Sequence, residues 1–141
     1  MDKARICITD WHEARDRVMP VRETVFVREQ GVPVEIELDE ADPSCRHAMA
    51  VVADGRVIGT GRLLPDGHVG RMAVLPDWRG KGVGARLLAG LVTEAERLGM
   101  DELVLNAQLT AEGFYARFGF QPEGEIFMEA GIAHRAMRRK L

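Results

Sequence analysis

The most informative stretch of this chain is Arg79-Gly80-Lys81-Gly82-Val83-Gly84, which follows an apolar run ending at Leu75 and opens a segment of helical periodicity over residues 82–98. Its three glycines fall within five residues, so the backbone can fold tightly and bring several N–H groups to one point. The first N–H groups of a helix have no intrahelical partner, and the helix dipole favours negative charge there. The stretch therefore predicts an anion site at a strand-to-helix junction, of a kind that suits a pyrophosphate.

The spacing excludes two well-known phosphate-binding patterns. A Walker loop needs Gly-Lys-Ser/Thr after a longer glycine loop, whereas Lys81 is followed by Gly82. The dinucleotide fingerprint needs G-x-G-x-x-G, whereas here single residues separate the glycines and an antiparallel meander precedes them. A glycine-rich turn with solvated charges is the simplest alternative. The junction with a helix favours anion binding, to which Arg79, Lys81 and Arg86 could add positive charge.

Hydrophobic periodicity along the whole chain predicts one domain, residues 1–141, of the α/β class, with a mixed sheet and helices against its faces in the order β-α-βββ-α-β-α-ββ. The predicted strands are residues 4–9, 46–53, 56–64, 68–75, 103–105, 120–128 and 134–141, and the predicted helices are 19–29, 82–98 and 110–118. The apolar segment 103–105 is typical of a central parallel strand, and Thr110 is expected to cap the last helix. Gly59, Gly61 and Gly70 suggest bulges or places where a ligand comes close.

Composition limits the class of protein. The chain has no long apolar run, which argues against a membrane span, and its first residues lack the core of a signal peptide. We therefore expect a soluble cytoplasmic protein. The net charge of −3 argues against a nucleic-acid partner, because such binders are normally basic.

The two cysteines and the basic C-terminus carry weaker signals. Cys7 and Cys45 have no metal-like spacing, so we expect no metal and interpret both as buried small hydrophobic residues. A nucleophilic Cys45 activated by His47 is a less favoured alternative. The last strand could be an edge that pairs two chains into a homodimer, or the run 138–140 could prevent such pairing by charge.

Several motifs together resemble one family. Arg79-x-x-Gly82-x-Gly84 matches the Q/R-x-x-G-x-G/A motif of the GNAT superfamily of N-acetyltransferases. Residues 71–76 resemble that family's fourth strand and residues 114–120 resemble its distal helix, so the resemblance covers nearly the whole chain. The segments 27–33, 106–108 and 129–134 are similar to the ElaA-like branch of the family.

The resemblance implies a GNAT fold with splayed central parallel strands and acetyl-CoA as cosubstrate. It implies that the N–H groups of the glycine stretch hold the pyrophosphate and that the fourth strand pairs with the pantetheine arm, much as an added strand would. The same backbone could donate to the thioester oxygen as negative charge builds there. The cofactor-binding residues implied are Met72, Ala73, Val74, Arg79, Gly80, Lys81, Gly82, Val83, Gly84 and Asn106.

Tyr115 is the candidate general acid. It matches the family's tyrosine beside the CoA sulfur, and a phenol with an ordinary pKa near 10 can protonate a departing thiolate. The alternative is a core aromatic packed with Phe114 and Phe118. That alternative suits Phe114 and Phe118 better, because these two already fill one face of the helix.

The general base is less defined. Many family members carry a carboxylate on the fourth strand, but residues 68–74 contain none. The remaining candidates for the base are Glu29, Glu35, Asp39, His68 and His134, of which Glu29, Glu35 and His134 are also the candidate acceptor-binding residues. The acidic stretch from 35 to 42 could attract a cationic amine, although such a run is usually a solvated loop.

The sequence therefore predicts an N-acetyltransferase that moves an acetyl group from acetyl-CoA to a primary amine by direct attack, using proximity and acid–base catalysis. One alternative is a non-catalytic acyl-CoA-binding module that reports CoA status to a partner. Another is a phosphate-binding nucleotide enzyme, which would need a carboxylate partner for magnesium that the sequence does not offer.

Overall fold

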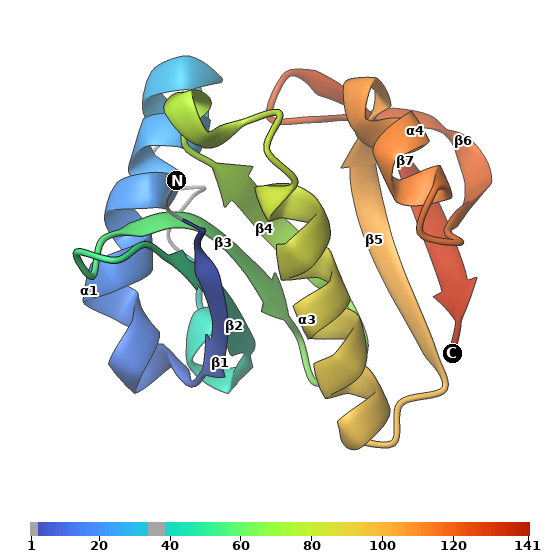
Figure 1. The fold of residues 1–141 in the computed structure, drawn as a ribbon. Helices are drawn as coiled ribbons and strands as arrows, with labels where there is room; N and C mark the ends of the chain where they lie inside the picture. The colour runs from blue at the N-terminus through green and yellow to red at the C-terminus, as the bar shows by residue number, and fades with distance from the viewer. Residues whose placement is uncertain (1–2, 34–38) are drawn as a thin grey trace.

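Four strands from the N-terminal half form one antiparallel sheet. The computed structural model describes residues 3–33 and 39–141. The strands pair in the order β1-β2-β3-β4, which is also their order along the chain. Their bounds are β1 (Arg5–Thr9), β2 (Arg46–Val51), β3 (Val57–Leu63) and β4 (Val69–Val74). Figure 1 shows this sheet between two long helices, α1 (Trp11–Arg22) and α3 (Val83–Arg97).

Alternation along β2 explains why each face of this sheet carries a helix. Ala48 and Ala50 belong to the main core with the apolar face of α3, whereas Met49 and Val51 pack with the buried residues of α1. Successive side chains of a strand point to opposite faces, so one strand of apolar residues serves both layers. Gly90 of α3 allows close contact, since a Cβ there would lie 3.0 Å from a methyl carbon of β1.

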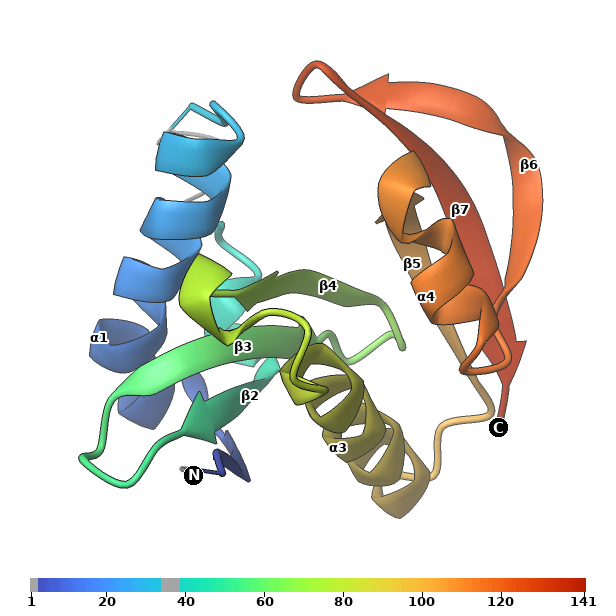
Figure 2. The same cartoon turned by 45° about the horizontal axis from the view of Figure 1, so that its top comes forward.

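The C-terminal half forms a second sheet that diverges from the first. The strands β5 (Glu102–Gln108), β6 (Gln121–Glu129) and β7 (Ile132–Lys140) pair in the order β5-β7-β6, and the short helix α4 (Glu112–Ala116) contacts β5 and β6. His68, the residue before β4, forms one parallel bridge to Val104 of β5, and β4 and β5 then separate (Figure 2). The predicted element order and splayed central strands are confirmed. In the part of the chain described, no helix is long and apolar enough to cross a membrane.

The predicted helix 19–29 ends at Glu29 as expected, but its predicted start is wrong. α1 begins at Trp11, and Asp10 caps it by accepting a hydrogen bond from the Glu13 backbone N–H at 3.0 Å. The Asp10-x-x-Glu13 spacing is a helix-start signal that the apolar pattern alone does not reveal. Pro20 removes one backbone donor inside the helix, and residues Glu23–Glu29 continue as a π-helix.

The last third of the chain brings three more corrections. β5 is longer than predicted and pairs antiparallel with β7 along its whole length, keeping only the single parallel bridge to β4. Thr110 lies in a 3₁₀ turn, so it does not cap α4, which begins after Ala111 without a side-chain cap. β7 is the middle strand of its sheet, so it cannot be the edge that pairs two chains. Arg138 instead donates hydrogen bonds to Glu102 and Glu123 on the strands at either side.

Candidate active site

The glycine stretch forms an open loop at the start of α3. Gly80 and Gly82 have φ of 75° and 79°, a conformation that other residues rarely adopt, and a Cβ built on either would meet nothing within 4 Å. Gly82 occupies the N-cap position and supplies no side-chain cap, so the first N–H groups of α3 face outward without one. The loop borders a cavity of about 570 Å³, which we call the loop cavity. Its lining residues are Val74, Trp78, Arg79, Gly80, Gly82, Val83, Gly84, Ala85, Phe114, Arg117 and Phe118.

Arg79 fastens this loop to the end of the π-helix. Its guanidinium donates two hydrogen bonds of 2.7 Å to the carboxylate of Glu29, and its Nε donates to the backbone carbonyl of Val74 at 2.9 Å. The hydrogen bond from Arg79 lowers the pKa of Glu29, which therefore stays ionised. Arg79 thus holds β4, the loop and the π-helix together.

The other two predicted cations have different positions. The ammonium of Lys81 lies 5.2 Å from the ring centroid of Trp78, beside the loop cavity. Arg86 donates to the backbone carbonyl of Ala4 and is not among the residues that line the loop cavity. Arg117 of the distal segment lines the loop cavity and was not predicted.

β4 carries a bulge where it begins to leave β5. Thr60 pairs with Ala73 and Arg62 pairs with Gly70, so two residues of β4, Arg71 and Met72, lie opposite a single residue of β3. That single residue is Gly61, where a Cβ would lie 2.3 Å from the sulfur of Met72. Arg71 has φ of 50°, which is uncommon for a residue with a side chain. The suggested bulge is confirmed. It leaves the backbone of Arg71 and Met72 outside the regular β3–β4 ladder, near the place where β4 and β5 diverge.

A second cavity of about 330 Å³ occupies the space between the diverging strands, and we call it the central cavity. It is lined by Phe26, Gln30, Val32, Arg62, Leu64, His68, Val69, Gly70, Arg71, Met72, Leu105, Asn106, Gln108, Ala111, Tyr115, Glu129, Ala130, Ile132 and His134. These residues come from the π-helix and from both sheets. A hydrogen bond of 2.9 Å from Gln108 to Gln30 links β5 to the segment after the π-helix beside this cavity.

α4 and the turn that follows it divide their aromatic side chains between the two cavities. Tyr115 lines the central cavity, whereas Phe114 and Phe118 line the loop cavity with their ring centroids 5.3 Å apart. Burial raises the pKa of Tyr115 to about 12, because the ionised phenolate would be poorly solvated. Tyr115 is therefore protonated at neutral pH, and it lies in the wall of the central cavity.

His134 lies on β7, is only 7% exposed and lines the central cavity. Its Nδ1 lies 2.7 Å from the backbone carbonyl of Ile132, and its Nε2 lies 3.6 Å from the carboxylate of Glu129. The ring of Phe127 stacks on it at 5.9 Å. The contacts with Ile132, Glu129 and Phe127 fix the orientation of the imidazole ring in the wall of the cavity.

The fold divides the predicted site residues into two groups. The central cavity gathers Met72, Asn106, Tyr115 and His134, and the loop cavity gathers Val74, Arg79, Gly80, Gly82, Val83 and Gly84. The side chain of Ala73 packs against Val21 and Val25, so only its backbone is available to a ligand at the cleft. Glu29 lies with Arg79 and not among the residues of the central cavity. Glu35 lies outside the described residues.

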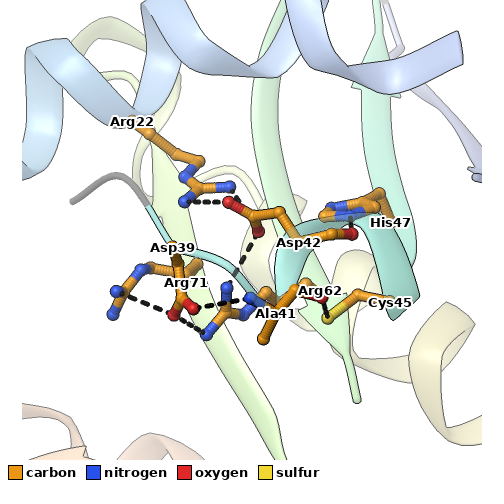
Figure 3. A network of polar contacts seen from close by, with 8 residues as sticks. All are labelled: Arg22, Asp39, Ala41, Asp42, Cys45, His47, Arg62 and Arg71. Carbon is orange, nitrogen blue, oxygen red and sulfur yellow. Dashed lines mark hydrogen bonds and ion pairs between the residues drawn. The ribbon is translucent and has the colours of Figure 1, made fainter. Parts of the chain in front are cut away.

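A largely buried ionic network includes Arg62 and Arg71 of the central cavity, and Figure 3 shows it. Arg22 makes two hydrogen bonds of 3.0 Å to Asp42, and Arg62 donates to Asp42 at 2.8 Å and to Asp39 at 2.7 Å. Arg71 donates to Asp39 at 3.3 Å. Burial alone would raise the pKa of Asp39, but hydrogen bonds from a backbone N–H and from Arg62 outweigh it and the pKa is lowered. Asp39 is therefore a fixed ionic partner of the arginines.

Cys45 has no sign of nucleophilic activation. Its thiol donates to the backbone carbonyl of Ala41 at 3.2 Å, and burial raises its pKa to about 11. His47 contacts the Asp42 carbonyl through Nε2 at 2.9 Å, and burial lowers its pKa, so both side chains are neutral and structural. Both cysteines are free, and no group of metal-ligating side chains occurs in residues 3–33 or 39–141.

Sequence reasoning missed several residues of the central cavity. Arg62 lies in no motif, and Gln30 and Gln108 lie in segments similar to the ElaA-like branch but were given no role in the site. Arg71 stands inside the matched strand, but its role in a bulge requires the register with β3. One sequence signal could have pointed to Arg62. Its neighbour Gly61 stands within a predicted strand, and a glycine in a strand marks a bulge or a close approach of another group.

Comparison with known proteins identifies the class of this fold and site. Residues 24–141 match the family model described as an acetyltransferase (GNAT) domain, so the chain belongs to the GNAT acetyltransferase family. Members of this family transfer acyl groups from acyl-CoA cosubstrates to acceptors. The chain is 40% identical over 124 residues to the uncharacterized N-acetyltransferase YjcF of Bacillus subtilis, covering 84% of this chain and 87% of that protein.

Solved structures place the chain in the same group. An acyl-CoA N-acyltransferase from Pseudomonas aeruginosa is similar with a TM-score of 0.86 and 30% identity, over 96% of this chain and 99% of that one. The protein ElaA of Escherichia coli is 31% identical over 131 residues, covering 88% of this chain and 86% of ElaA. Its crystal structure gives a TM-score of 0.87 at 27% identity, over 96% of this chain and 99% of that one. The resemblance to the ElaA-like branch is confirmed.

Proposed function

We propose that this chain is an N-acetyltransferase that moves the acetyl group of acetyl-CoA to a primary amine of a small molecule or peptide by direct attack. The observation that carries the proposal is that the two cavities share two elements of the fold. Val74 of β4 and Phe114 of α4 line the loop cavity, and Met72 and Tyr115 of the same two elements line the central cavity. A long ligand held at the loop can therefore extend along β4 into the central cavity.

The loop cavity fits the phosphate end of acetyl-CoA. Its left-handed glycines leave open space beside the start of α3, where backbone N–H groups and the helix dipole favour an anion. Arg117 and Lys81 supply positive charge nearby. The pantetheine arm would follow β4, and the bulge at Arg71 and Met72 would turn backbone donors towards the thioester oxygen.

The central cavity fits the reacting groups. Aminolysis of a thioester requires a neutral amine, an oriented carbonyl and a proton for the leaving sulfur. Tyr115 retains its proton at neutral pH and would deliver it to the sulfur. Its raised pKa makes complete transfer to a free thiolate unfavourable, so Tyr115 would recover a proton as it gives one up. Aminolysis of a thioester by these groups needs no metal ion. We also propose that the protein is cytoplasmic.

The proposal is tested by two measurements on the purified protein, namely calorimetric titration with acetyl-CoA and thiol release in the presence of a panel of amines. The panel should contain amino acids, polyamines, aminoglycosides and short peptides with a free N-terminus or lysine. We expect saturable binding of acetyl-CoA and thiol release that depends on at least one amine. Binding without amine-dependent release would favour a non-catalytic acyl-CoA-binding module, and absence of binding would overturn the proposal.

A further inference from the structure

The hydrogen bonding of His134 fixes which of its ring nitrogens carries the proton. Nδ1 lies 2.7 Å from the backbone carbonyl of Ile132, and a carbonyl oxygen can only accept a hydrogen bond. Nδ1 must therefore be the nitrogen that bears hydrogen. In the neutral ring the other nitrogen, Nε2, then has a free lone pair.

The surroundings of Nε2 suit a nitrogen that gains a proton. The Glu129 carboxylate lies 3.6 Å away and would stabilise an imidazolium once it forms. The His134 side chain is 9% exposed and stacks on Phe127, so the orientation of its ring is fixed. The other ionisable or charged side chains that line the same cavity are Arg62, His68, Arg71 and Tyr115.

We propose that Nε2 of His134 is the general base that removes a proton from the acceptor ammonium in the central cavity. This inference rests on the proposed function. It assigns a residue to the deprotonation of the amine, a step for which the fourth strand offers no carboxylate. The competing groups are less suited to the role. His68 is about half exposed and its Nδ1 lies 2.9 Å from Asp66, while Glu29 and Asp39 are held in ion pairs with arginines.

The proton balance of the step is complete with two side chains. His134 Nε2 takes one proton from the ammonium, and the freed lone pair forms the C–N bond while the carbonyl electrons move to oxygen. When the adduct collapses, the C–S bond breaks and sulfur keeps the electron pair. Tyr115 protonates the sulfur and regains a proton from the adduct nitrogen, and the proton on His134 leaves to solvent. The products are an amide, free CoA and one proton.

The sharpest test compares two acceptors of nearly equal shape and different basicity. At pH 7.5 ethylamine is protonated and needs a base, whereas 2,2,2-trifluoroethylamine is already neutral. We expect His134→Gln to lower kcat/KM for ethylamine by about 100-fold and for trifluoroethylamine by less than about 5-fold. Equal losses with both amines would overturn the assignment, because a merely structural role does not distinguish acceptor basicity.

Two further histidine variants complete the kinetic test. His12→Gln changes an exposed histidine of α1 outside both cavities and is expected to leave kcat/KM unchanged. His68→Gln tests the competing base, and a loss with ethylamine as large as that of His134→Gln would overturn the assignment. Thermal unfolding of each variant separates loss of chemistry from loss of folding.

The tautomer can be measured without turnover. In protein labelled with ¹⁵N-histidine, long-range ¹H–¹⁵N correlations distinguish the two neutral tautomers, and the signal absent from His134→Gln identifies the residue. We expect the neutral ring of His134 to carry its hydrogen on Nδ1. Hydrogen on Nε2 would overturn the inference while leaving the proposed function intact. Conversely, absence of amine-dependent thiol release from the wild-type protein with every amine would overturn the function itself.

Discussion

The loop cavity and the central cavity take their walls from different kinds of chain segment. Most of the loop cavity comes from the contiguous run 78–85, with aromatic rings of the distal segment opposite. The central cavity collects side chains from the π-helix, β3, β4, β5, α4 and the β6–β7 hairpin. The first depends on backbone conformation and the second on tertiary assembly. Changes in the loop cavity should therefore lower the affinity for acetyl-CoA and leave turnover intact. Changes in the central cavity should lower turnover and leave the affinity for acetyl-CoA intact.

The largest effect is expected at Gly82. Gly82→Asp forces a side chain into a left-handed conformation with φ of 79° and places a carboxylate where a pyrophosphate would bind. We expect acetyl-CoA affinity to fall by about 30- to 700-fold in calorimetric titration, since a like charge nearby costs about 2–4 kcal/mol.

The chain offers a matched control at the other end of the same helix. Gly99 has φ of 77°, so Gly99→Asp introduces a similar backbone strain and the same charge. We expect it to lower the unfolding temperature and leave acetyl-CoA affinity unchanged. If both variants weakened binding equally, general destabilisation would explain the loss and the loop cavity would have no special role.

Tyr115→Phe should separate the central cavity from the loop cavity. The change removes the O–H group and keeps the ring, so we expect kcat to fall by about 10- to 100-fold while the Kd for acetyl-CoA stays within about twofold. Phe114→Leu, in the loop cavity, should do the reverse and weaken acetyl-CoA binding more than turnover. Loss of acetyl-CoA affinity in Tyr115→Phe would contradict the division between the two cavities.

Glu94→Gln is expected to affect stability without touching either cavity. Hydrogen bonds from Arg97, opposed by burial and supported by Arg46, lower the pKa of Glu94 from 4.5 to about 2. A lowered pKa in the folded state stabilises the fold above pH 4.5, and this contribution is lost as the pH falls towards 2. After allowance for solvent screening, we expect a loss of about 1 kcal/mol at pH 7 in urea unfolding.

The pH series supplies the check on this stability prediction. The difference between wild type and Glu94→Gln should shrink as the pH falls from about 4.5 towards 2, because the carboxylate of the unfolded chain takes up its proton first and that of the folded chain only near pH 2. Glu102→Gln, which removes an exposed partner of Arg138 in the other sheet, should cost about 0.5 kcal/mol or less. A loss at Glu94 that did not depend on pH would mean that packing, not charge, explains the effect.

The smallest effect should stabilise the rim of the central cavity. Ala130 and Gly131 form the turn between β6 and β7 with φ of 50° and 77°, and both positions favour Asn or Gly over Ala. Ala130→Asn should raise the free energy of unfolding by about 0.5–1 kcal/mol, because it removes the strain of a left-handed alanine. The unfolding midpoint in urea measures the gain, and a decrease would show that the Ala130 methyl group makes a needed contact.

The two cavities also differ in how far the sequence predicts them. The loop was predicted because glycine spacing and the apolar pattern of a helix are local properties. The bulge at Arg71 was only suggested, since a bulge is defined by the register of two strands. The network of Arg62 with Asp39 and Asp42 could not be predicted, because residues about twenty apart meet only once the sheet has formed.

The same distinction explains the errors in the fold. The start of α1 depends on the Asp10 cap, and the π-helical turn follows a proline inside a helix, so neither appears in the hydrophobic period. Strand order is a non-local property, so β7 was expected at an edge although it pairs on both sides. The predicted end of the helix 82–98 is confirmed within one residue, because its signal is local: Gly99 follows it with φ of 77°.

Tyr115 is the only tyrosine of the chain, and it lies in the wall of the central cavity. A fluorinated tyrosine supplied during expression would therefore place one ¹⁹F nucleus in the protein, at the cavity and nowhere else. Its chemical shift would report directly on any small molecule that enters. The protein thus carries an intrinsic labelling position with which a compound library can be searched for the acceptor by spectroscopy, before any turnover assay has been established.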